Sequence, residues 1–118
     1  MPIAIKRAYE AASAEDGYRV LVDGLWPRGT TKGQLKIDAW MREIAPSASL
    51  RKWYGHKPEK WEEFRKKYRT ELANPPRKVL FDELVERARK GPVTLIFAAR
   101  DAERSNATVI AEIIQGGL

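Results

Sequence analysis

Polar residues that could bind an anion follow two apolar segments of this sequence, 18–23 and 93–98. Asp23 ends the first segment and Arg28 follows it, and Arg100 and Asp101 follow the second. An arginine guanidinium donates two parallel hydrogen bonds to a phosphate or a carboxylate. A carboxylate beside it could orient a water, a hydroxyl or a divalent cation. These residue types predict a site for a small anionic ligand.

Neighbouring residues could complete such a site. The residues expected to contact the ligand are Trp26, Arg28, Gly29, Arg100 and Asn106. Loops that hold a large aromatic side chain beside an arginine are common at binding sites. Structural roles are the alternative: Trp26 could cover the core, and Asp101 could cap the last helix. Arg28 could likewise pair with Asp23 and close the loop.

Acid–base catalysis is a further hypothesis, and the sequence offers three residues for it. They are Asp23, His56 and Asp101. His56 is the only histidine, and an imidazole titrates near neutral pH. It also lies just before Pro58, a residue well suited to open a helix, where a histidine is often only a loop or capping residue. Whether the protein is an enzyme therefore stays open.

The apolar pattern predicts the elements that would position these residues. Segments 18–23 and 93–98 indicate buried strands, 3–7 a half-buried strand, and 25–33 a loop. Helices are expected at 37–44, 58–72, 78–90 and 103–115, where apolar residues recur three and four apart. Buried strands separated by helices form parallel sheets through right-handed crossovers. We expect an α/β fold, a single domain over 1–118 with a small, mostly parallel sheet flanked by helices. The carboxyl ends of its strands would meet at one edge, where ligands bind in such folds.

Composition removes several classes of function. The 118 residues include no cysteine and one histidine, which excludes disulfides and thiolate chemistry and makes a zinc site unexpected. Glycine-rich nucleotide-binding motifs are missing as well, so no cofactor and no metal is predicted. No apolar run approaches the about 20 residues that span a membrane. We expect no membrane partner and a cytoplasmic location, and the oligomeric state is left open.

The charge of the chain suggests a second class of function. Lys and Arg number 22 against 16 Asp and Glu, a formal net charge of +6, and a positive surface attracts nucleic acid. The densest basic stretch contains Arg65, Lys66, Lys67 and Arg69. It could contact phosphates, with Trp61 or Tyr68 stacking on bases. Both aromatics also follow the period expected of a helix core, so the alternative is a solvated helix face. A module that binds nucleic acid or a protein partner is the second hypothesis.

A resemblance to a known family adds to these expectations. The segments that carry it are Gly17-Tyr18-Arg19-Val20-Leu21-Val22-Asp23, Leu25-Trp26-Pro27-Arg28-Gly29, Ile44-Ala45-Pro46-Ser47, Leu50-Arg51-Lys52, Phe64-Arg65 with Tyr68, Glu71 and Leu72, and Val93-Thr94-Leu95 with the last helix. Over nearly its whole length the chain resembles the YeaO-like family of uncharacterised bacterial and archaeal proteins. The resemblance implies a small α/β domain and no particular reaction.

Two positions depart from that family pattern. Family members often carry Arg where Gly24 stands, and an Asn-His pair where Ser105-Asn106 stands. The first difference implies a weaker cradle for an anion. The second removes an imidazole, so chemistry that depends on this histidine is not expected here.

Overall fold

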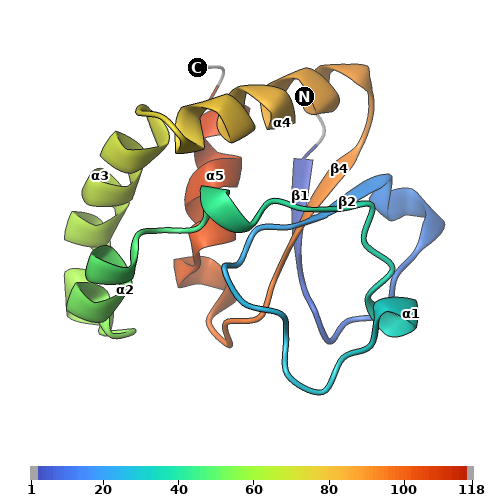
Figure 1. The fold of residues 1–118 in the computed structure, drawn as a ribbon, viewed down its shortest axis with the longest axis horizontal. Helices are drawn as coiled ribbons and strands as arrows, with labels where there is room; N and C mark the ends of the chain where they lie inside the picture. The colour runs from blue at the N-terminus through green and yellow to red at the C-terminus, as the bar shows by residue number, and fades with distance from the viewer. Residues whose placement is uncertain (1–2, 117–118) are drawn as a thin grey trace.

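The computed structural model describes residues 3–116, and its centre is a sheet of four strands in the order β1, β4, β2, β3 (Figure 1). The strands are Ile3–Arg7 (β1), Tyr18–Leu21 (β2), Ala39–Trp40 (β3) and Val93–Phe97 (β4). Every pairing in this part of the chain is parallel. The predicted α/β class with a small parallel sheet is therefore confirmed.

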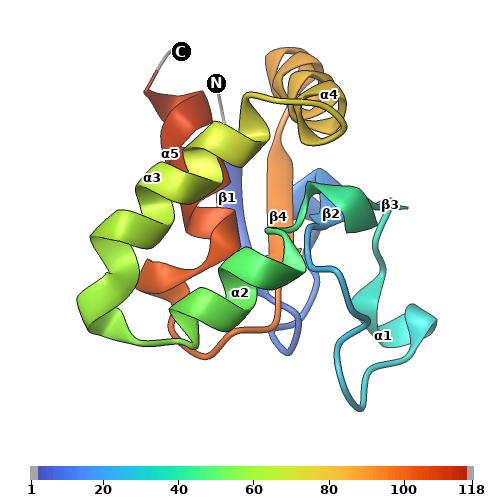
Figure 2. The ribbon, with the colours of Figure 1, turned by 60° about the vertical axis from the view of Figure 1, so that its left-hand side comes forward.

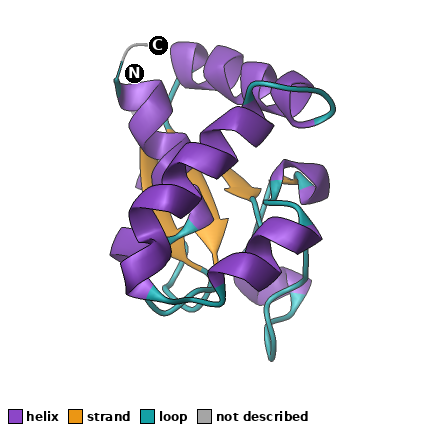
Figure 3. Ribbon diagram, turned by 90° about the vertical axis from the view of Figure 1, so that its left-hand side faces the viewer, coloured by secondary structure: helices purple, strands orange, loops and turns teal. Residues whose placement is uncertain are grey.

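Five helices flank the sheet in the described part of the chain. They are Lys32–Leu35 (α1), Ala48–Tyr54 (α2), Trp61–Leu72 (α3), Arg77–Lys90 (α4) and Asn106–Gln115 (α5). Helices α2 to α5 lie together over one face of the sheet (Figure 3). The small helix α1 stands apart from them beside the loop that follows β2 (Figure 2).

The core has two parts because β4 is buried on both faces. Leu95 and Phe97 pack into the larger part, beneath helices α2 to α5. Ile96 points the other way, into a smaller cluster with Leu21 and Leu35. Successive strand residues alternate between faces, so one apolar strand supplies both clusters.

The helix predicted at 37–44 is wrong. The structure has strand β3 there, followed by a 3₁₀ turn at Arg42–Ile44. Trp40 packs on the smaller cluster and Met41 on the larger one, so neighbouring side chains face opposite sides, as in a strand. The N–H of Met41 donates to the Leu21 carbonyl at 2.9 Å, which satisfies the open edge of β2.

The boundaries of the other elements differ less from the predicted ones. The predicted loop at 25–33 holds the start of α1, where Thr31 and Gln34 form a capping box. The helix predicted at 103–115 begins instead at Asn106, because Ser105 is its N-cap and a separate 3₁₀ turn precedes it. The helices expected at 58–72 and 78–90 are confirmed, the first after a 3₁₀ turn at Pro58–Lys60.

A buried ion pair holds the beginning of β2. Arg19 Nη1 lies 2.6 Å from Asp16 Oδ2, and Arg19 Nη2 donates to the Leu35 carbonyl at 2.6 Å. Gly17 lies between the two charged residues with φ +64°, where an added Cβ would stand 2.3 Å from the Pro92 carbonyl oxygen. Only glycine fits this close approach. The pair therefore fixes the entry to β2 and the end of α1 together.

None of the helices described for residues 3–116 is long and apolar enough to cross a membrane.

Candidate functional site

At the carboxyl ends of β2 and β4, the chain segments that leave the two strands run to different parts of the core. These strands are neighbours. The chain leaves β2 toward α1, whose Leu35 packs in the smaller cluster, and leaves β4 toward α5, which packs on β1 and β4 in the larger one (Figures 1 and 2). In open α/β sheets the crevice at such a switch point is the usual place for a ligand. We use the name β2–β4 crevice for this junction of the two strand ends.

Asp23 stands in the β2–β4 crevice and joins the two strand ends. Its Oδ2 accepts a hydrogen bond of 2.9 Å from the N–H of Ala98, the residue after β4. Asn106, at the start of α5, donates its Nδ2 to the Val22 carbonyl at 2.9 Å. The indole N–H of Trp40 donates to the Asp23 carbonyl at 2.7 Å. The crevice is thus fixed by β2, β4, β3 and α5.

The surroundings of the Asp23 carboxyl make it harder to ionise than usual. Burial raises its pKa, while the N–H of Ala98, the Asn106 side chain and the charge of Arg51 act in the opposite direction. Burial prevails. Burial thus disfavours the charged form of Asp23, while its Oδ2 still accepts from the Ala98 N–H.

The two arginines predicted to hold an anion are exposed. Within residues 3–116, neither Arg28 nor Arg100 forms a hydrogen bond or ion pair through its side chain, so the alternative pairing of Arg28 with Asp23 is not formed. Gly29, which follows Arg28, has φ +72°. It lines an open depression of about 560 Å³ between the loop after β1 and α1. Both guanidinium groups are therefore free to meet a ligand.

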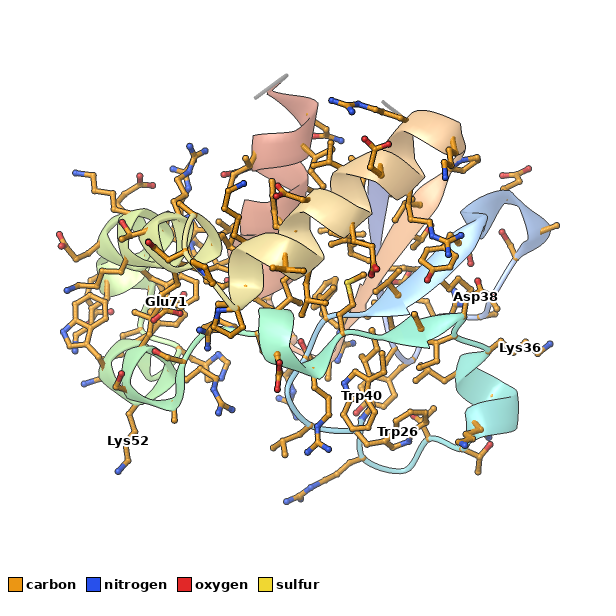
Figure 4. All side chains as sticks on the ribbon, turned by 45° about the horizontal axis from the view of Figure 1, so that its top comes forward. Trp26, Lys36, Asp38, Trp40, Lys52 and Glu71 are labelled. Carbon is orange, nitrogen blue, oxygen red and sulfur yellow. The ribbon has the colours of Figure 1, made fainter. Side chains whose placement is uncertain are left out.

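Trp26 covers the smaller cluster, which is the structural role given above as its alternative. Its indole N–H donates to the Thr30 carbonyl at 2.6 Å, and its ring meets Trp40 edge-on at 5.5 Å between centroids (Figure 4). The side chain is still half-exposed. Trp26 therefore shapes the loop that carries Arg28, whatever contact it makes with a ligand.

Asp101 caps the 3₁₀ turn Ala102–Arg104, whereas the last helix, which it was expected to cap in the structural alternative, is capped by Ser105. Asp101 Oδ1 accepts from the N–H of Glu103 at 3.1 Å, and its Oδ2 pairs with Arg104 at 3.0 Å. The hydrogen bond from Arg104 is the main reason that its pKa is lowered. Asp101 is engaged with these two partners, and a catalytic role for it stays a prediction.

His56 lies in the turn between α2 and the 3₁₀ turn that precedes α3. It is exposed, its φ is +56°, and its ring centroid is 6.1 Å from that of Tyr54. Burial raises the pKa of Tyr54, and the charge of Asp101 adds to this effect. His56 thus lies near Tyr54, whose pKa is also affected by the charge of Asp101. A catalytic role for His56 stays a prediction.

Helix α2 contributes two residues that the sequence did not single out. The charge of Arg51 reaches Asp23, and Tyr54 lies near enough to Asp101 and Arg104 for their charges to affect its pKa. A signal existed in the sequence, because Arg51 and Tyr54 are three apart and share one side of a helix capped by Ser47. Its meaning depends on where α2 is packed, and no local pattern shows that.

The aromatic residues of α3 are not available to nucleic acid bases. Trp61 and Tyr68 are buried, and the Tyr68 hydroxyl donates to the Ile44 carbonyl at 2.6 Å. Stacking on these rings is therefore excluded. Tyr54 is buried too, and Trp53 is covered by Lys60 and Lys67, so these two do not form an exposed aromatic patch.

A metal centre has no obvious place in the part of the chain that the structure covers, where no three His, Cys, Asp or Glu side chains gather closely enough to hold an ion.

Comparison with known proteins identifies relatives along nearly the whole chain. A family model described as the inactive DUF488-N3 subclade matches residues 2–118. The uncharacterized protein YeaO of Escherichia coli (strain K12) is 40% identical over 112 residues, covering 95% of this chain and 96% of the relative. The uncharacterized protein Rv3073c of Mycobacterium tuberculosis (strain ATCC 25618 / H37Rv) is 38% identical over 114 residues, covering 97% and 94%. No solved structure matches.

Proposed function

This chain belongs to the inactive DUF488-N3 subclade, and we propose that it is a cytoplasmic domain that binds a small anionic ligand at the β2–β4 crevice. The observation that carries the proposal is the divergence of the connections at this crevice, with Asp23 at its centre. The word inactive in the description of the subclade favours binding over turnover. Catalysis by Asp23 or His56 is the alternative.

Arginines on three different elements supply the positive charge in this proposal. Arg28 follows β2, Arg100 follows β4, and Arg51 lies on α2. All three are exposed, and within residues 3–116 none of the three is engaged in an ion pair. Because each guanidinium can donate two hydrogen bonds in one plane, two of them suffice to surround a phosphate or carboxylate group.

Asp23 sets the selectivity of the crevice in this scheme. An ionised Asp23 would repel an anion, but burial raises its pKa, which makes the carboxylate a better acceptor for a proton carried by a ligand. A ligand that carries a proton or a hydroxyl next to its negative charge could share that proton with Asp23. Hydrogen phosphate and phosphomonoesters have this chemistry, and fully ionised sulfate does not.

Calorimetric titration with inorganic phosphate and with sulfate tests the proposal. We expect phosphate to bind more tightly than sulfate at about pH 6. The single variants Arg51→Ala and Arg100→Ala should each weaken phosphate binding about tenfold, the effect of losing a charge-assisted hydrogen bond. Arg28→Ala should act in the same direction.

The matched control is Arg69→Ala, which removes the same charge from an exposed position on α3. It should leave phosphate affinity unchanged. The proposal is wrong if phosphate does not bind at millimolar concentrations. It is also wrong if Arg69→Ala weakens binding as much as the crevice variants do.

A further inference from the structure

The positive charge of this protein is concentrated in one helical hairpin. Residues 52–69, which run from α2 through the Pro58–Lys60 turn into α3, contain seven Lys and Arg and three Glu. This net +4 is most of the +6 of the whole chain. We call this segment the basic hairpin. Positive charge concentrated in one segment produces a local field that attracts polyanions.

Two lysines of the basic hairpin are held in place on Trp53. The Lys60 ammonium lies 4.8 Å from the centroid of the Trp53 ring and donates to the Trp53 carbonyl at 2.8 Å. The Lys67 ammonium lies 5.1 Å from the same ring. Cation–π contacts of this kind restrict two flexible side chains before any partner arrives. Less entropy is then lost when the partner binds.

Other cations of the hairpin are free. Lys52, Lys66 and Arg69 are exposed, and within residues 3–116 their side chains have no hydrogen bond or ion pair. Lys52 extends from α2 into solvent (Figure 4). Arg65 differs, because it pairs with Glu62 and Glu112, at 2.8 Å in each case. The available positive charge thus belongs to lysines and to Arg69.

The hairpin offers charge without an apolar anchor. Among residues 3–116 the large hydrophobic side chains that are exposed are Tyr9, Leu25 and Val79, all outside it. A helix that lies on a membrane inserts an apolar face, and a protein interface centres on buried aromatic or aliphatic anchors. Phosphates along a nucleic acid require only Lys and Arg. The surface therefore fits nucleic acid better than lipid or protein.

We propose that the basic hairpin binds the phosphate backbone of duplex nucleic acid without sequence preference. Base stacking has no part in it, since Trp61 and Tyr68 are buried. Helix α3 has 12 residues and is about 18 Å long at 1.5 Å per residue, enough to follow several phosphates. This surface uses none of the crevice residues Asp23, Arg51, Arg100 or Asn106, so it is independent of the function proposed above.

Fluorescence anisotropy with two labelled 20-base-pair duplexes of unrelated sequence tests this inference. About four phosphate contacts would give a slope near −3.6 for the logarithm of affinity against the logarithm of salt. Affinity would then fall about a hundredfold between 50 and 200 mM NaCl. The two duplexes should bind equally.

The double variant Lys52→Gln/Lys66→Gln should lose about two phosphate contacts and reduce the steepness of the slope by about 1.8. Its matched control, Lys32→Gln/Lys90→Gln, makes the same change of net charge at exposed positions on α1 and α4. The control should keep the wild-type slope. Thermal melting of both variants confirms that they are folded.

Four results would overturn the inference: no duplex binding at 50 mM NaCl, an equal loss in both double variants, a tenfold preference between the duplexes, or tighter binding to phosphatidylserine vesicles than to either duplex. Calorimetric titration of Lys52→Gln/Lys66→Gln with inorganic phosphate separates this surface from the β2–β4 crevice. Phosphate affinity should be unchanged in this variant, whichever way the duplex experiment turns out.

Discussion

At the scale of single residues, Asp23 carries a conflict between its charge and its position. Its carboxyl is partly removed from water, which raises its pKa, yet its Oδ2 is needed to accept from the N–H of Ala98. Ionisation of Asp23 therefore destabilises the folded state, whereas its hydrogen bond with the Ala98 N–H stabilises it. The two can be separated by substitution, because an amide keeps an accepting oxygen of similar shape and loses the charge.

We predict that Asp23→Asn is at least as stable as the wild type at pH 7, whereas Asp23→Ala loses about 1–3 kcal/mol because the Ala98 N–H is left without a partner. The folded pKa of Asp23 is raised, so its ionisation disfavours the folded state as pH rises through that value. The advantage of Asp23→Asn should therefore vanish below about pH 3, where the carboxyl is protonated in the folded and unfolded states alike. Urea unfolding at pH 7 and at about pH 3 measures the difference in stability between Asp23→Asn and the wild type. Equal destabilisation by Asn and Ala at pH 7 would contradict the prediction.

At the scale of elements, the Asp16 carboxylate joins four segments of the chain. It ends the 3₁₀ turn Ala14–Asp16, accepts from Lys6 of β1 at 3.0 Å, and pairs with Arg19 of β2 at 2.6 Å. Arg19 in turn donates to the Leu35 carbonyl of α1. Burial by itself would raise the pKa of Asp16, but hydrogen bonds from the Ser13 N–H, Lys6 and Arg19 outweigh it and lower the pKa to about 2.

Because this pKa lies below the value of about 3.9 in an unfolded chain, the carboxylate stabilises the fold above about pH 4, and this contribution is lost as pH falls toward 2. We predict that Asp16→Asn costs about 3–5 kcal/mol at pH 7, since it leaves the buried Arg19 without its counter-charge. The difference from wild type should shrink between pH 4 and pH 2 in urea unfolding. Glu15→Gln, at the exposed neighbouring position, is the control and should stay near the wild type throughout. A difference of constant size across that range would contradict the assignment.

At the scale of the whole molecule, strand β4 couples the two parts of the core. Leu95 contributes to the larger part and Ile96 to the smaller one, and both are fully buried. Loss of β4 would therefore expose apolar residues of both parts of the core. The four tryptophans report on both sides: Trp26 and Trp40 pack on the smaller cluster, and Trp53 and Trp61 belong to the larger one.

We therefore predict one cooperative unfolding transition. Tryptophan fluorescence and far-UV circular dichroism should give coincident melting curves, the usual sign of two-state behaviour in a domain of this size. The same coincidence should hold in Trp53→Phe, whose fluorescence is weighted toward the smaller cluster, and in Trp40→Phe, which is weighted toward the larger. An earlier fluorescence transition in Trp53→Phe alone would show that the α1 side unfolds separately.

The sequence predicts those elements whose pattern is local and long. Trp61, Phe64, Tyr68 and Leu72 recur along α3 at helical spacing and are all buried in the structure. The opposite case is 37–44, where Trp40 and Met41 suit a short helix equally well by sequence. A two-residue strand has too few positions to establish a period. The unpaired edge of β2 decides between the two, and that edge exists only in the folded sheet.

The candidate site, like the fold, could be predicted from the sequence only in part. The sequence by itself determined which polar residues end the strands, and Asp23 and Asn106 do meet across the β2–β4 crevice. Only the tertiary structure brought the charge of Arg51 within reach of Asp23, paired Asp101 with Arg104 and held Lys60 and Lys67 on Trp53. Strand ends are encoded locally, because a buried strand must stop where polar residues begin. The position of a helix across a sheet edge depends on the packing of side chains far apart in the sequence, which no local pattern contains.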